Sequence, residues 1–170
     1  MIKAYHFTGK TLRHGSPIPA IGQWIQHEGP IVPCHSGLHA SVHPFDALEF
    51  APGTILHRVT LHGEIIRESN KIVGRSRRID ATIDATDMLR AFARKCALDV
   101  YHLWNCPIIV KNYLQTGYES LRAAARDAAR AAAWAASRDA AWDAARDAAR
   151  DAQRNTFAAM VDAEFAKAGF

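Results

Sequence analysis

Residues 121–154 read LRAAARDAARAAAWAASRDAAWDAARDAARDAQR, so a large residue, Arg or Trp, stands at every fourth position. Alanine is the best helix former, arginine is close behind it, and the stretch contains no Gly or Pro that would end a helix. We therefore expect one long helix here. Because alanine buries little area, the folding core should come mainly from residues 1–118.

The four-residue period restricts how this helix can pack. Four residues turn an α-helix through about 400°, so the stripe of large side chains drifts by roughly 40° at each step. A period above 3.6 predicts a right-handed supercoil if the stripe stays on one partner helix. The aspartates between the arginines cancel most of the positive field, which disfavours direct binding to nucleic acid. We expect close packing against another helix, and a homo-oligomer.

Two tryptophans mark where that contact should lie. Trp134 and Trp142 are eight residues apart on nearby helix faces, with Arg138 between them. Exposing both would be unfavourable on a monomer. They either pack onto the chain's own N-terminal domain or anchor a helix of a second subunit, because aromatic and Arg side chains supply most interface hot spots.

The composition predicts an α+β protein of two parts. The chain has 170 residues, 49% of them hydrophobic, and a formal net charge of +4. A globular domain over 1–118 followed by a repeat helix over 119–166 fits this length and the change in composition. The charge permits an anionic partner without requiring one. The three cysteines lack a disulfide-framework spacing and no apolar run reaches the ~20 residues that cross a bilayer, so we expect a cytoplasmic protein with no membrane span.

The N-terminal domain should be rich in β-strands. Residues 1–33 contain short apolar runs broken by Gly and Pro, which is typical of strands and turns. A short helix is expected to begin near Pro44, since proline is tolerated in the first helical turn. Residues 54–66 alternate as one half-buried strand, or as two strands around Gly63, and residues 71–79 form another strand.

Two core helices should follow these strands. From Asp84 the apolar period lengthens to about three and a half residues, which predicts a helix that is capped by Asp84 or Thr86 and runs to about Trp104. A second helix should begin after Pro107 and end at Gly117 as its C-cap.

Four basic residues lie close together in the expected strand over 71–79: Lys71, Arg75, Arg77 and Arg78. Such a cluster is usual on a solvated edge strand, where charge discourages aggregation. The alternative is a set of contacts to a ligand phosphate.

A second cluster could bind a metal. Cys34, His35, His39 and His43 lie within ten residues, and Cys together with His would suit zinc. The pattern lacks a matched second pair of ligands further along the chain. The sequence therefore assigns no metal and leaves zinc open.

Three segments of the N-terminal half form a different pattern: YHFTG at 5–9, SGLHAS at 36–41 and DALEFA at 46–51. Read together, they resemble the N-terminal half of an ADP-ribosyltransferase-type domain. The resemblance implies NAD as the cofactor, His6 as the contact to the nicotinamide-side ribose, and His39 as the residue that stacks on the nicotinamide. His39 would match the His-containing branch that includes RNA 2'-phosphotransferases, with Ser41 beside it.

The third catalytic residue of that family, a Glu or Gln on a later strand, has no matching counterpart here. Glu64 and Glu68 are the acidic candidates nearby, and their context differs from the family's. Without that carboxylate the pocket could bind a nucleotide without turning it over. His6 and His39 could equally be hydrogen-bonded structural histidines.

A longer resemblance covers almost the whole chain. SGLHAS is followed in order by CALDVYHLW at 96–104, YLQTG at 113–117 and the Ala-Arg-Asp helix. This order resembles a family of uncharacterised proteins from bacteriophages and prophages. It implies a phage accessory protein, located in the host bacterial cytoplasm. Many small proteins of this class counter host defence by binding a host protein or a nucleotide signal, which enters here as a class expectation.

We therefore expect a phage-type accessory protein that engages a host protein or a nucleotide ligand and self-associates through its long helix. An anti-defence role is one option for such a protein. The alternative is an ADP-ribosyltransferase-like enzyme that uses NAD. A third reading is a structural module in which the helix alone matters. The missing carboxylate favours binding over catalysis, because an oxocarbenium-like transition state needs stabilising charge nearby.

Overall fold

The computed structural model describes residues 1–103, 105–136 and 142–170, without the side chains at 103 and 130–148. The chain forms two compact units: one comprises Met1–Asp87 together with Thr156–Phe170, and the other Met88–Asn155. The first holds an antiparallel sheet and the second is helical, which confirms the α+β class.

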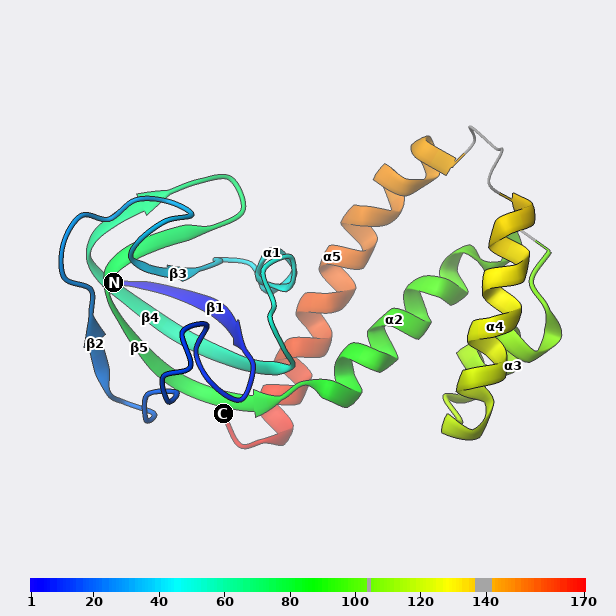
Figure 1. The fold of residues 1–170 in the computed structure, drawn as a ribbon, viewed down its shortest axis with the longest axis horizontal. Coiled ribbons are helices and arrows are strands. Elements are labelled where there is room, and N and C mark those ends of the chain that lie inside the picture. The colour runs from blue at the N-terminus through cyan, green and yellow to red at the C-terminus, as the bar shows by residue number, and fades with distance from the viewer. Residues whose placement is uncertain (104, 137–141) are drawn as a thin grey trace. The chain divides into compact units, whose positions relative to one another are not determined.

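The first unit is built on a five-stranded sheet (Figure 1). The strand order is β1-β4-β5-β2, and β3 also pairs with β5. The strands are β1 (Ile2–Thr8), β2 (Trp24–Gln26), β3 (Leu38–Ala40), β4 (Ile55–Arg67) and β5 (Ile72–Asp84).

Strands β4 and β5 form the long hairpin at the centre of the sheet. The expected break at Gly63 is a local irregularity within one strand: the register shifts between His62 and Ile65, and Gly63 has a φ of +81° that favours glycine. The expectation of a basic edge strand was wrong. Strand β5 pairs with β4 along one side and with β2 and β3 along the other, so its basic residues lie in the interior of the sheet.

The C-terminal segment completes the core of this unit. Phe157, Val161 and Phe165, at successive four-residue steps of α5 (Trp142–Lys167), are all 0% exposed. The ring of Phe157 meets Phe45 edge to face at 6.0 Å, and the Phe165 ring lies 4.3 Å below the Arg58 guanidinium. The core therefore draws on residues well beyond 1–118.

The expected short helix is α1 (Pro44–Leu48), with the Nδ1 of His43 accepting a hydrogen bond from the Phe45 N–H at its N-cap. Helix α2 (Thr86–Val100) begins where Asp84 accepts from the Thr86 N–H at 2.9 Å. It ends before the predicted Trp104, and a 3-10 turn, η1 (Tyr101–Leu103), follows.

The helical unit contains α3 (Ile108–Thr116) and α4 (Glu119–Ala136). Gly117 has a φ of 69° and its N–H donates to the Tyr113 carbonyl, which confirms the predicted C-cap. Val110 and Leu114 of α3 form a small apolar core with Ala125 of α4, so part of the alanine face packs within the chain.

The repeat is helical on both sides of residues 137–141, since α4 ends at Ala136 and α5 begins at Trp142. Those five residues, including Arg138, lie outside the described part of the chain, as do the side chains of Trp134 and Trp142. One continuous helix and a tryptophan interface thus stay predictions. Among the described residues, no helix is both long and apolar enough to span a membrane.

The C-terminal contact can be tested with two phenylalanines that differ in burial. We expect Phe157→Ala to lower the free energy of unfolding by about 3–5 kcal/mol, because it empties a fully buried site. Phe170→Ala is the matched control, since Phe170 is 51% exposed, and it should cost less than about 1 kcal/mol. Urea unfolding measures both. Equal losses would show that the end of α5 does not contribute to the core as described.

Candidate functional site

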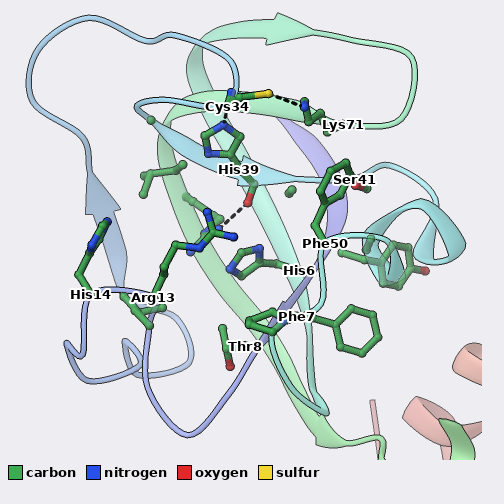
Figure 2. Close-up of a pocket in the computed structure, with 18 of the residues that line it drawn as sticks. His6, Phe7, Thr8, Arg13, His14, Cys34, His39, Ser41, Phe50 and Lys71 are labelled. Carbon is green, nitrogen blue, oxygen red and sulfur yellow. Dashed lines mark hydrogen bonds between the residues drawn. The ribbon is translucent and has the colours of Figure 1, made fainter.

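A cavity of about 360 Å³ opens in the sheet-containing unit (Figure 2). Its lining includes all three residues that the ADP-ribosyltransferase resemblance suggested: His6, His39 and Ser41. Lys71 and Arg77 line it as well, while Arg75 and Arg78 do not. The rest of the lining comes from β1 and the loop after it, from β3 and the turn before it, and from α1 and the segment after it: Tyr5, Phe7, Thr8, Thr11, Leu12, Arg13, His14, Cys34, His35, Gly37, Leu38, Ala40, Ala47, Phe50 and Pro52.

The turn before β3 positions His39. Gly37 has a φ of +108°, and a Cβ there would lie 2.4 Å from a methyl carbon of Val73, so only glycine fits. The N–H of Cys34 donates to the Nε2 of His39 at 3.2 Å. His39 is therefore neutral, with its proton on Nδ1. Burial lowers the pKa of His39, and the nearby Lys71 and Arg77 cations add to this effect, while a hydrogen bond to the Gly37 backbone opposes it.

Arg77 is the buried cation of the site. It is only 4% exposed, and its Nη1 donates to the carbonyl oxygen of His39. Its Nε has no hydrogen-bond partner in the described chain, and no described carboxylate forms an ion pair with it. Burial lowers the pKa of Arg77 to about 10. A buried charge without a counter-ion costs several kcal/mol, so this side chain is prepared for an anion.

A buried hydrogen-bond chain lies beneath His6. The hydroxyl of Thr8 donates to the Gly9 carbonyl, so it must accept from the Nε2 of His57 at 2.9 Å. The Nδ1 of His57 then accepts from the Thr82 hydroxyl at 2.8 Å. Both nitrogens of this fully buried ring are satisfied in the neutral form.

Burial and the Arg77 cation set the protonation of these imidazoles. Burial lowers the pKa of His57 to about 4, and Arg77 adds to this effect. Burial also lowers the pKa of His6 well below its usual value, with Arg77 and His57 as further causes. The two rings are stacked with centroids 6.4 Å apart. At neutral pH the site therefore holds neutral imidazoles around one buried guanidinium.

The mouth of the cavity carries a second cation. The Nζ of Lys71 lies 2.8 Å from the Sγ of Cys34, 3.1 Å from a carboxylate oxygen of Glu68 and 5.1 Å from the Phe50 ring centroid. The hydrogen bond to Cys34 is the main cause that raises the pKa of Lys71. Phe50 is 44% exposed, so an aromatic surface and a cation lie together at this rim.

The lining carries cationic groups without acidic ones. Arg13, Lys71 and Arg77 contribute charge, four histidines add polar donors, and none of the described lining residues is Asp or Glu. The acidic candidates of the sequence are paired with basic side chains: Glu64 pairs at 2.6 Å with Arg75, which lies outside the cavity, and Glu68 pairs at 3.1 Å with Lys71 of the lining. The cavity is thus complementary to an anion and lacks a catalytic carboxylate among its described residues.

The remaining predicted basic residues have structural contacts outside the cavity. Arg75 pairs with Glu64 and donates to the carbonyls of His27 and Gly29, which ties down the loop after β2. Arg78 pairs with Asp80 at 2.8 Å and lies over the Trp24 ring. The four basic residues are therefore divided between the cavity and the rest of the sheet.

The zinc hypothesis gains no support from the geometry. His39 accepts from the Cys34 N–H, and His43 caps α1. Across the described residues, no three His, Cys, Asp or Glu side chains are grouped so that they could hold a metal ion.

Sequence reasoning missed Arg13, Phe50 and His57. Arg13 lies in a loop without regular pattern, and Phe50 follows a helix too short to show a period. His57 had a usable signal, since a histidine on the inward face of an alternating strand must find partners. Its pairing with His6 across β1 and β4 depends on strand register.

The protonation of His57 predicts how stability depends on pH. The folded state keeps His57 neutral down to about pH 4, whereas the unfolded chain takes up a proton near 6.5, so stability should fall as the pH falls through that window. Through His57 alone, the free energy of unfolding should fall by about 3 kcal/mol across this window. Unfolding at a series of pH values and NMR titration of the ring protons measure it. A midpoint near 6.5 for His57 in the folded protein would contradict the buried neutral assignment.

A family model described as "Domain of unknown function (DUF7666)" matches residues 2–91. Curated proteins and solved structures gave no match. The matched segment includes every residue that lines the cavity, so the cavity belongs to the family's domain. It also covers more than half of the 170-residue chain, and this protein therefore belongs to the DUF7666 family.

Proposed function

We propose that this protein binds an anionic ligand of the nucleotide class in the cavity and acts as a phage-type accessory binding protein. The observation that carries the proposal is Arg77, a residue that is 4% exposed, lines the cavity and has no ion pair with a described carboxylate. A bound anion would supply the missing counter-charge.

The size and chemistry of the cavity support a small-molecule ligand. Its volume of about 360 Å³ falls in the range of roughly 300–1,000 Å³ that is usual for such sites. Planar guanidinium groups favour phosphate because their forked donors match two of its oxygens. Arg13 provides further positive charge, and the ammonium of Lys71, which also pairs with Glu68, lies in the same lining; both suit a phosphate that carries more than one negative charge.

The alternative function is an ADP-ribosyltransferase-like reaction with NAD. It is favoured by the convergence of His6, His39 and Ser41 on one cavity. It lacks a carboxylate among the described lining residues to stabilise positive charge that develops on the sugar. We therefore rank it second.

The accessory role also includes assembly. We propose that the repeat over 119–166 mediates self-association, with Trp134, Trp142 and Arg138 at the contact, and that the protein acts on a host protein or nucleotide signal in the bacterial cytoplasm. These parts rest on the sequence pattern and the phage resemblance.

The binding proposal is tested by calorimetry and thermal unfolding with AMP, ADP-ribose, NAD and inorganic pyrophosphate. At least one should bind wild type and raise its midpoint of unfolding, since a ligand stabilises the state that binds it. Arg77→Met should weaken that binding by tenfold or more, because it removes the buried donor. Arg78→Met is the matched control, since Arg78 is the neighbouring arginine and lies outside the cavity, and it should bind as wild type does. Absence of binding by all four ligands would overturn the proposal.

Incubation with labelled NAD and host lysate separates the two functions. We expect no transfer of label. Transfer that disappears in both His6→Ala and His39→Ala would establish the enzyme and contradict a purely binding role.

A further inference from the structure

We infer that the ligand enters phosphate first, with its phosphate at Arg77 and its planar base against Phe50 at the cavity mouth. The inference rests on the proposed function and adds an orientation and a specificity-determining residue. It assigns the cavity to a nucleoside monophosphate or a larger molecule that contains one.

The phosphate end is fixed by the depth of the two strongest donors. Arg77 is a buried residue of the central strand of the sheet, whereas Lys71 lies beside Phe50, which is 44% exposed. A phosphate that stopped at the rim would leave the buried guanidinium uncompensated. The deep position removes that cost and still leaves Lys71 to attract the ligand from solvent.

The base end is indicated by the one large apolar side chain of the lining that is strongly exposed. Phe50 is 44% exposed, while Phe7, the other phenylalanine of the lining, is 2% exposed and belongs to the core. Covering exposed aromatic area at the edge of a polar cavity with a flat apolar group lowers the free energy of the complex. His39 on β3 and Phe50, which follows α1, both line the cavity (Figure 2).

The cation beside Phe50 supports an aromatic partner over an aliphatic one. The Nζ of Lys71 lies 5.1 Å from the ring centroid, within range of a cation–π contact. A nucleobase stacked at this rim meets both the ring and the ammonium. Stacking on an aromatic side chain contributes affinity for any base, because every base has a π-face. The site should therefore prefer ligands that carry a base over ligands that lack one, and it should distinguish less between different bases.

The test compares probes that differ only at one end: AMP, ribose 5-phosphate, adenosine and inorganic phosphate. We expect AMP to bind wild type roughly five- to 150-fold more tightly than ribose 5-phosphate, the range of a base–aromatic stack. Phe50→Leu should abolish the tighter binding of AMP and leave the affinity for ribose 5-phosphate unchanged. Phe50→Tyr should keep it, and Phe170→Leu, at an exposed phenylalanine outside the cavity, should bind as wild type does. Circular dichroism and thermal unfolding confirm that each variant is folded.

The outcomes separate this inference from the proposed function. If ribose 5-phosphate binds through Arg77 and AMP binds no better, or if Phe50→Leu does not reduce the AMP advantage, the orientation is wrong and anion binding stands. If neither phosphate ester binds, or if Arg77→Met binds both as wild type does, the orientation and this use of Arg77 both fail. Adenosine binding that exceeds AMP binding would also overturn the phosphate-first orientation.

Discussion

Strand β5 hydrogen-bonds to β4 along one side and to β2 and β3 along the other, and the site depends on this pairing. A strand with partners on both sides can hold a buried arginine because its backbone groups are already satisfied by the ladder. Arg77 pairs in register with Ile25 and Leu61, so its position is set by two neighbours at once. The sheet thereby fixes the position of the buried cation, while the strand pairing does not reduce the cost of keeping its charge out of water.

The neutral state of the histidines around Arg77 follows from the burial of this cation. A second positive charge beside a buried guanidinium would raise the electrostatic cost, so the adjacent imidazoles must be neutral. The contacts of His57 to Thr8 and Thr82 satisfy both ring nitrogens in that form, and the acceptor role of the His39 Nε2 toward the Cys34 N–H requires it. The cavity therefore holds one buried cation beside neutral imidazoles, and Arg13 and Lys71 are further cations of its lining. This arrangement is suited to ground-state binding of an anion, and it offers less to a reaction that builds positive charge on a sugar.

Local patterns in the sequence predicted much of the fold and only part of the site. The start of α1 at Pro44 and the cap at Gly117 could be read directly, because the geometry they require is met by few residue types. The central position of β5 could not be predicted from the sequence, because its pairing with β2 and β3 joins segments that are distant in the chain. The convergence of His6, His39 and Ser41 was suggested by a family resemblance. The burial of Arg77 was hidden, since a basic residue in a strand can face either solvent or a cavity.

The C-terminal end of α5 changes how the role of the repeat has to be studied. Phe157, Val161 and Phe165 repeat every four residues, as the alanine stretch before them does, and this shared period concealed their membership of the sheet's core. A chain that stopped near Gly117 would lose all three and expose the apolar surface they cover. Its failure would report on the core and say nothing of assembly. Polar substitutions at Trp134 and Trp142 leave Phe157, Val161 and Phe165 unchanged, so the oligomeric state of such a variant tests whether the repeat contributes to self-association.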